Sequence, residues 1–168
     1  MCSLAVLGGV EAEDELKSAT LLAFVQNAHW SDRFAADTPL TVGVMGRPAF
    51  IRQLRTSVEG KSVNGHLLRI VEWNGTADPN CCQVFYCATE KSAEIKPVLQ
   101  SFNAAHVLTI GEWDGFLDAG GAVNLFLTDG HMAFEVNLRA LDKAGVEISS
   151  RLLRFGQIRG RTKGRPLP

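Results

Sequence analysis

The side chains in this 168-residue chain whose types best suit catalysis are its cysteines and histidines. A thiol nucleophile would come from Cys82 or Cys87, and it would need a nearby base. His106 would act as that base, and Asp114 would orient it. No local signature supports this set, and cysteines inside an apolar run are usually inert packing residues. A cysteine-dependent hydrolase is therefore the weaker alternative, and we expect a protein that is not an enzyme.

Metal and phosphate sites have no better support in the sequence. The histidines show no i, i+4 pairing, and the cysteines lack the Cys-x-x-Cys spacing of a zinc site. Gly46 stands between an apolar run and Pro48, where a helix N-terminus holds an anion in some folds. The glycine-rich fingerprints of dinucleotide and P-loop sites are missing. We therefore expect no metal and no cofactor.

The charge of the chain is close to balanced but unevenly distributed. The net charge is -1, yet six basic residues lie within 151–165 and no acid follows Glu147. A basic terminus of this kind contacts nucleic acid or anionic lipid in some proteins, but a Gly/Arg/Pro-rich end is more often simply solvated. We assign residues 159–168 to a flexible basic tail and expect no nucleic-acid binding. No run of eighteen apolar residues occurs, so a membrane span is not expected.

The first residues resemble part of an export signal. Residues 3–12, SLAVLGGVEA, are a short apolar run that ends with small residues at Val10 and Ala12. We interpret residues 1–12 as a residual signal-peptide segment, with the mature chain beginning near Glu13 in the periplasm. The alternative is a disordered N-terminus on a cytoplasmic protein.

Strands alternate with helices along the rest of the chain. Helices are expected over 13–30, from Pro48 to Gly60, from Pro97, over 138–145 and over 148–158. Strands are expected over 39–46, after a turn at Asn64-Gly65, over 81–88 and over 105–111. The pattern predicts one α/β domain over 13–158. We expect a layered sandwich in which helices flank a mixed β-sheet that ends in a C-terminal antiparallel hairpin.

The hairpin is the most distinct local prediction, because two runs with high strand propensity flank Asp129-Gly130. A two-residue turn there places Asn124 opposite Glu135. One face of the hairpin then carries Val123, Leu125, Leu127, Met132, Phe134 and Val136, and the other carries Asn124, Phe126, Thr128, His131, Ala133, Glu135 and Asn137.

The second face predicts a structural polar network. Glu135 accepts a hydrogen bond from the amide of Asn124, which satisfies both side chains locally. Asn137 belongs to the same face. If the C-terminal helix covers this face, the groups that complete the network are Ser149, Ser150 and Arg151. A buried Glu135 would need Arg151 or several donors. The alternative is that this face is in contact with water.

These segments resemble the YfiR family. The stretch 120–137 and the following AGVEISSRLLRF are similar to the closing motif of that family, and LKSATLLAFVQNAHW is similar to its opening helix. GKSVNG and CQVFYCA also occur in the order typical of the family, so the resemblance covers about residues 14–157.

The resemblance implies a small periplasmic protein without catalytic activity. Relatives bind the periplasmic sensor part of an inner-membrane diguanylate cyclase, repress it, and so lower cyclic-di-GMP and biofilm formation; a homodimer is the expected assembly. Aromatic residues in loops are the interface candidates, because exposed aromatics often anchor interfaces. They are Trp30, Trp73, Trp113 and Phe116. The alternative function is a small-molecule-binding domain with its pocket at the carboxyl ends of the early strands, near Gly46 and Ala88.

Overall fold

The computed structural model describes residues 3–30, 34–35, 37–75, 78–88 and 92–159. Within these residues an eight-stranded sheet has the order β10-β8-β7-β6-β5-β2-β4-β3. Its strands are β2 (Leu40–Met45), β3 (Ser62–Val63), β4 (His66–Glu72), β5 (Val84–Cys87), β6 (Leu108–Gly111), β7 (Val123–Thr128), β8 (His131–Asn137) and β10 (Gln157–Arg159). A second, antiparallel pair consists of β1 (Ala28–Trp30) and β9 (Val146–Ile148).

The sheet is mixed, as the sequence predicts. Strands β4, β2, β5, β6 and β7 are parallel neighbours in that order. Strand β8 returns antiparallel to β7, and β10 is parallel to β8. The central strands read as continuous apolar runs because helices cover both faces of a parallel sheet.

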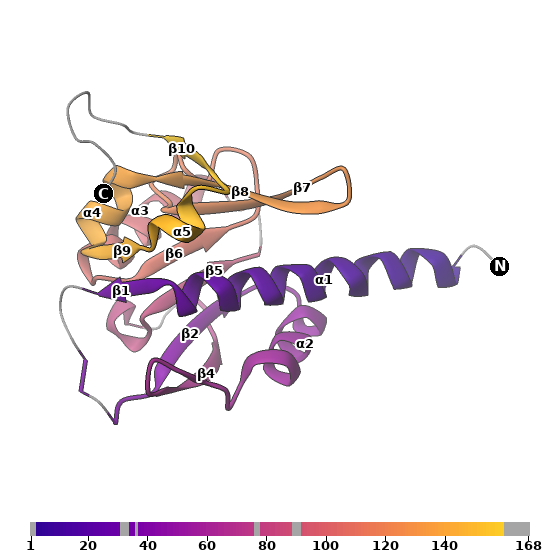
Figure 1. Ribbon diagram of the computed structural model, residues 1–168, viewed down its shortest axis with the longest axis horizontal. Helices are drawn as coiled ribbons and strands as arrows, with labels where there is room; N and C mark the ends of the chain where they lie inside the picture. Colours follow the sequence, from indigo (N-terminus) through magenta and orange to yellow (C-terminus); the bar gives the residue numbers. More distant parts are fainter. Residues whose placement is uncertain (1–2, 31–33, 36, 76–77, 89–91, 160–168) are drawn as a thin grey trace.

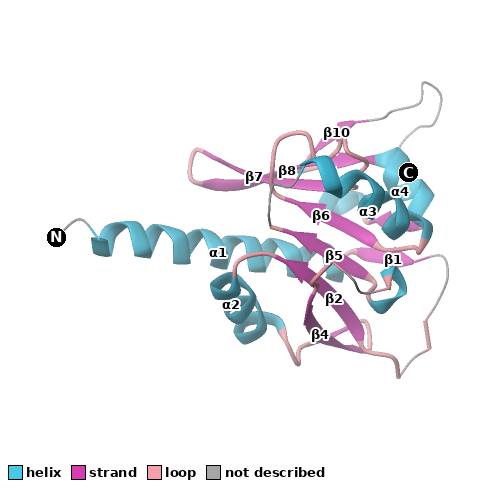
Figure 2. Cartoon of the chain, turned by 180° about the vertical axis from the view of Figure 1, so that it is seen from behind, coloured by secondary structure: helices cyan, strands magenta, loops and turns pink. Residues whose placement is uncertain are grey.

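The helices form the two outer layers (Figures 1 and 2). They are α1 (Ser3–Gln26), α2 (Pro48–Val58), α3 (Ser92–Ala104), α4 (Leu138–Ala144) and α5 (Ser150–Leu153), with a short 3-10 helix, η1 (Pro79–Cys81). Helices α1 and α2 cover one face of the sheet, and α3 covers the other. No helix in the described part of the chain has both the length and the apolar character that crossing a bilayer requires.

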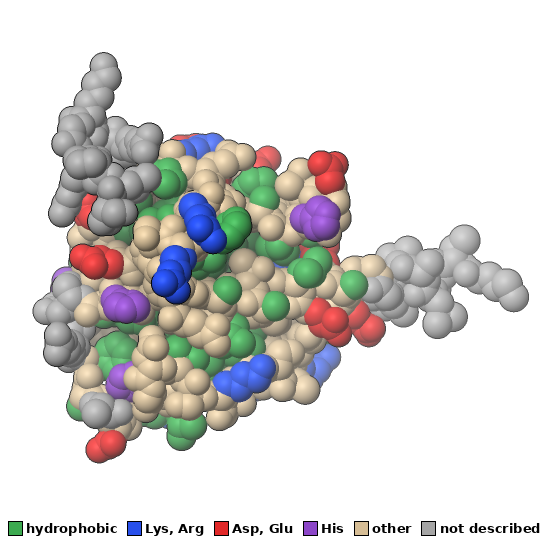
Figure 3. Space-filling view, in the orientation of Figure 1, with side chains coloured by type: hydrophobic (Ala, Val, Ile, Leu, Met, Phe, Trp, Pro, Cys, Tyr) green, Lys and Arg blue, Asp and Glu red, His purple; other side chains and the backbone are tan. Residues whose placement is uncertain are grey.

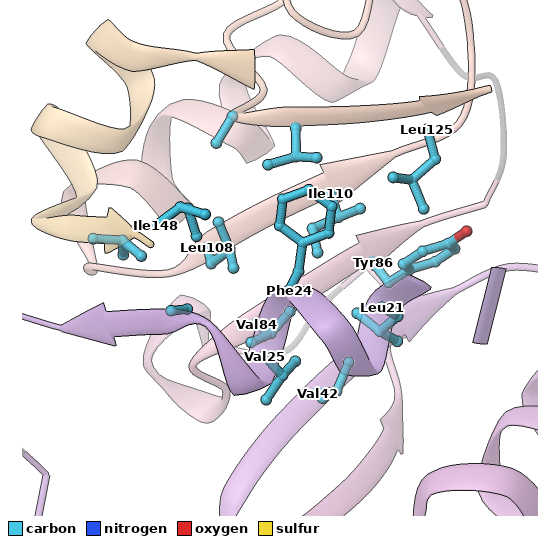
Figure 4. Packing of buried hydrophobic residues seen from close by; sticks show 14 of the residues in the cluster. Leu21, Phe24, Val25, Val42, Val84, Tyr86, Leu108, Ile110, Leu125 and Ile148 are labelled. Carbon is cyan, nitrogen blue, oxygen red and sulfur yellow. The ribbon is translucent and has the colours of Figure 1, made fainter. Parts of the chain in front are cut away.

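Alternate residues of the central strands supply two hydrophobic cores. Figure 4 shows the first core, in which the Phe24 ring of α1 lies beside Ile110 and Leu21 of the same helix lies nearer to Tyr86. The second core lies beneath α3, where Phe85 stacks on Phe102 with ring centroids 4.2 Å apart. Most fully buried large side chains belong to one of these two cores, so both faces of the sheet are fixed by packing.

Several predicted elements are confirmed. Helix α2 begins at Pro48, and α4 ends where Gly145 adopts a left-handed conformation with φ 63°. The turn at Asn64-Gly65 connects β3 to β4, and both residues have positive φ. The hairpin turns at Asp129-Gly130 in the expected register, from Thr128 with His131 to Val123 with Val136.

Other predicted boundaries differ from the structure. The first helix begins at Ser3, so residues 3–12 are its first turns, and it ends at Gln26 because residues 28–30 pair with β9 instead. Helix α3 continues through Pro97 rather than beginning there. Pro97 is exposed, while Ile95, Leu99 and Phe102 of the same helix are fully buried, and this packing outweighs the hydrogen bond that proline loses.

The loop between β6 and β7, residues 112–121, depends on two glycines. The Phe116 ring lies between Gly111 and Gly121, where an added Cβ would come within 2.4 Å and 2.1 Å of ring atoms. Phe116 itself is fully buried. A side chain at either glycine would therefore displace the ring that anchors the loop.

We expect Gly121→Ala to lower the free energy of unfolding by about 1–3 kcal/mol, the usual effect of overpacking a filled site. Urea unfolding monitored by circular dichroism measures the change. Gly9→Ala is the matched control, because nothing lies within 4 Å of the new Cβ and the residue is in a helix, so it should be neutral or stabilising. Equal stability of wild type and Gly121→Ala would contradict the packing described for Phe116.

Candidate functional site

The β7–β8 hairpin places Asn124 and Glu135 directly opposite each other. Both are buried, at 2% and 8% exposure. The Asn124 amide donates to Glu135 Oε1 at 3.3 Å, and its Oδ1 accepts from the backbone N–H of Trp113 at 3.1 Å. At Asn124 and Glu135, the polar face of the hairpin is therefore buried inside the protein and is not in contact with water.

The cation that pairs with Glu135 is Arg159, not Arg151. Its Nη2 lies 2.9 Å from Glu135 Oε2, and its Nη1 lies 3.7 Å from Asp118 Oδ1. Arg159 reaches this position because β10 pairs in parallel with β8, aligning Gln157 with Glu135. From the sequence we assign Arg159 to the flexible tail. No local signal identifies β10, because it has only three residues and its partner β8 is distant in the sequence. Residues 160–168 lie outside the described residues.

The C-terminal helix docks on the apolar face of the hairpin rather than on the polar one. Leu153 of α5 lies in the same core as Phe134, and an added Cβ at Gly156 would meet the Phe134 ring at 2.1 Å. Ser149 Oγ caps α5 by accepting from the Arg151 N–H at 3.3 Å, whereas Ser150 and Arg151 are exposed. The apolar side chains of α5 determine this orientation, so Ser149, Ser150 and Arg151 do not complete the network.

The polar face is covered instead by the loop 112–121. Asn137 Nδ2 donates to the Leu117 carbonyl at 3.4 Å, while its Oδ1 caps α4 at the N–H groups of residues 139 and 140. On the same loop, the Gly120 carbonyl accepts from Asn103 Nδ2 at 2.9 Å. The loop is therefore held by side chains from α3, β7 and β8.

The start of the loop is anchored to α1. Glu112 Oε2 lies 3.0 Å from Lys17 Nζ and accepts from the Tyr86 hydroxyl at 2.9 Å, and Lys17 also pairs with Glu13 at 2.7 Å. Burial raises the pKa of Tyr86 well above 10.0, and the charge of Glu112 raises it further. Burial alone lowers the pKa of Lys17, but Glu13 and Glu112 outweigh it and raise that pKa above 10.5. Sequence periodicity gives no sign of these contacts.

The carboxyl edge of the early strands is packed closely where the sequence suggests a pocket. A Cβ at Gly46 would lie 2.8 Å from the Ala88 Cβ. Asp14 of α1 binds Arg47 Nη2 through both carboxylate oxygens, at 2.8 and 3.1 Å. The residues beside Gly46 are therefore already in contact with other parts of the protein, Gly46 with Ala88 and Arg47 with Asp14.

A pocket of about 260 Å³ lies instead beside the amino end of β2. Trp30 and Phe34 form an aromatic wall with ring centroids 5.8 Å apart, and the His66 ring lies 4.6 Å from Phe34. His66 Nδ1 is 2.8 Å from the Thr38 carbonyl, which only accepts, so this nitrogen carries a proton and donates to it. The remaining lining residues are Ala28, His29, Leu40 and Asn64.

The four aromatic interface candidates are less exposed than a surface anchor requires. Phe116 is fully buried and Trp73 is 9% exposed, and both pack in the core beneath α3. Trp30 and Trp113 are half-buried. Their size favours burial over exposure, so the structure removes Phe116 and Trp73 from the candidate interface.

The cysteines of the hypothetical catalytic set are buried in the core. Cys82 is 3% exposed and Cys87 fully buried, and burial together with the Cys81 thiol raises the pKa of Cys82, which keeps this thiol protonated. His106 Nδ1 lies 3.1 Å from the Ala144 carbonyl. Among the described residues, no cysteine forms a disulfide and no cluster of three His, Cys, Asp or Glu side chains is suited to a metal.

The fold and these polar networks define a layered α/β domain whose charged groups are used for structure. A profile of the YfiR/HmsC-like family matches residues 14–157, and the chain belongs to this family. It is also similar to the crystal structure of a conserved domain protein from Vibrio cholerae, with a TM-score of 0.59 and 13% sequence identity. That match covers 86% of this chain and 59% of the other chain, and it shows the fold alone. No curated protein matches the sequence.

The contact between Glu112, Lys17 and Tyr86 predicts a loss of stability at high pH. Both raised pKa values belong to the folded state, so the stabilisation is fully present below about pH 10 and is lost as the pH rises through the folded values. Tyr86 is the single tyrosine of the chain, so absorbance reports its ionisation directly. We expect its phenolate to appear well above pH 10, together with unfolding seen by circular dichroism.

The control for this titration is Glu112→Gln, which removes the negative charge but leaves Tyr86 buried. Its phenolate should form at lower pH than in the wild type and still above that of free tyrosine. A phenolate that forms near pH 10 in a wild-type protein that remains folded would contradict the arrangement.

Proposed function

We propose that this protein is a periplasmic regulator that binds the sensor part of an inner-membrane diguanylate cyclase and holds the enzyme inactive. Membership of the YfiR/HmsC-like family over residues 14–157 is the observation that supports this function most directly. The closing motif of the resemblance supplies Asn124 and Glu135, and Arg159, which follows the motif, completes their network. The expected results of this activity are low cyclic-di-GMP and reduced biofilm formation.

Co-expression with a membrane diguanylate cyclase from the same genome tests the proposal. We expect several-fold lower cyclic-di-GMP when the protein is exported to the periplasm behind a cleavable signal. The same chain retained in the cytoplasm is the matched control, because it never meets the periplasmic sensor part. A cyclase that lacks this sensor part should not respond. Unchanged cyclic-di-GMP with every cyclase of that genome would rule the proposal out.

The pocket beside β2 favours a second candidate function, the binding of a small molecule. Its aromatic wall suits a flat apolar ligand, and the His66 ring adds a polar group to the lining. The Trp30 Nε1 is buried and, among the described residues, has no hydrogen-bond partner. Because a buried N–H without a partner is costly, a ligand acceptor would stabilise it if the Trp30 side chain turned to expose this N–H.

A thermal-shift screen with small aromatic metabolites tests this second function. A ligand that binds only the folded state raises the melting temperature, and we expect His66→Phe to abolish that rise. His131→Phe is the control, because His131 is exposed beside the hairpin turn and far from the pocket in the fold. A screen without any shift, or a shift that persists in His66→Phe, would exclude this pocket.

A further inference from the structure

The turn between α5 and β10 holds an aromatic side chain in solvent. Phe155 is 70% exposed, more than any other large hydrophobic residue that the structure describes. The turn is not a loose end, because the N–H groups of residues 155 and 156 donate to the carbonyls of Leu152 and Leu153, each at 3.1 Å. Gly156 packs against the Phe134 ring, where any side chain would collide. With Gly156 and Leu153 facing the core, Phe155 is directed outward.

One arginine side chain contacts this ring, and a second lies on the short helix α5. The Arg154 guanidinium carbon lies 4.9 Å from the centroid of Phe155, which is a cation–π contact. Arg151 lies three residues before Arg154, so the two occupy neighbouring positions on one helical face. Both are exposed. Figure 3 shows basic side chains over α5 beside hydrophobic surface. We call Arg151, Arg154 and Phe155 the Arg–Phe surface.

Within the described residues, no ion pair neutralises the charge of this surface. Among the described ion pairs none involves Arg151 or Arg154, whereas Arg159 is already paired with Glu135 and Asp118. The sequence contains no acidic residue after Glu147. An anionic partner would therefore meet unpaired guanidinium groups, which form strong bidentate bonds with carboxylates.

We propose that the Arg–Phe surface is the docking site for an acidic protein segment, in which carboxylates surround an apolar contact for Phe155. The inference rests on the proposed function, and it makes the sensor part of the cyclase the first partner to examine. A protein segment suits this surface better than a bilayer does. Interfacial membrane helices present a long apolar stripe to the lipid, whereas Leu152 and Leu153 of the short α5 pack against the core.

The other edge of the sheet provides a matched control pair. Leu67 of β4 is 59% exposed, and Arg69 lies two residues further along the same strand, also exposed and on the same side. This pair combines an exposed apolar side chain with an exposed arginine, as the Arg–Phe surface does, but at the far end of the strand order. Substitutions of Leu67 and Arg69 therefore remove the same types of side chain as substitutions of the Arg–Phe surface do, but outside the proposed site.

The first arm of the test titrates the purified periplasmic sensor part of the cyclase with the full chain. We expect Phe155→Ser and Arg151→Glu/Arg154→Glu each to weaken binding by about tenfold or more. The charge reversal should also reduce the salt dependence of binding, while Phe155→Ser should leave it unchanged. Leu67→Ser and Arg69→Glu should bind like the wild type. If wild type and all variants bind equally, the docking site is overturned and the proposed function stands.

The second arm uses probes that do not depend on the proposed function. They are a synthetic peptide of alternating glutamate and leucine, and vesicles of phosphatidylcholine with phosphatidylglycerol. If the sensor part does not bind but the peptide binds only when Phe155 and the two arginines are intact, the proposed function falls and the docking site stands. The docking site is overturned if the sensor part does not bind and the peptide either does not bind or binds the wild type and the variants equally. Binding confined to vesicles overturns it in favour of a membrane contact.

Discussion

The buried carboxylate of Glu135 is the constraint on which the C-terminal half of this protein depends. A charged group at 8% exposure is costly unless hydrogen bonds and an opposite charge compensate it. Asn124 on β7 and Arg159 on β10 provide both, at 3.3 and 2.9 Å. One side chain of β8 therefore fixes the strands on either side of it, β7 and β10, and β10 is only three residues long.

The consequences extend in two directions through the fold. Towards the N-terminus, Asn124 binds the loop 112–121, and Glu112 of that loop binds Lys17 of α1, so the polar face of the hairpin is coupled to the helix on the opposite face of the sheet. Towards the C-terminus, holding β10 in place fixes the turn after α5, where Phe155 is exposed. The charged groups thus position surfaces in a chain that belongs to the YfiR/HmsC-like family and that we propose acts by binding.

Much of this fold could be predicted from local sequence signals, and the missing parts share one physical cause. Asp129-Gly130, Pro48 and Gly145 mark a turn, a helix start and a helix end without reference to distant residues, and the register that places Asn124 opposite Glu135 follows from the turn alone. The partner of Glu135 could not be predicted, because Arg159 is aligned only by a strand that forms against β8. Likewise, α5 covers the apolar face of the hairpin because the chain after it packs against Phe134. This contact joins distant residues, so no local sequence pattern predicts it.

The coupling between Glu135 and Arg159 is the most direct measure of this account. A double-mutant cycle with Glu135→Gln, Arg159→Gln and the double variant gives their interaction energy from urea unfolding. Because Arg159 is half exposed, we expect a coupling of about 1 kcal/mol, with the single Arg159→Gln change more harmful than the same change made in the Glu135→Gln background. Additive effects, within about 0.3 kcal/mol, would show that the pair does not hold β10 and would contradict the account.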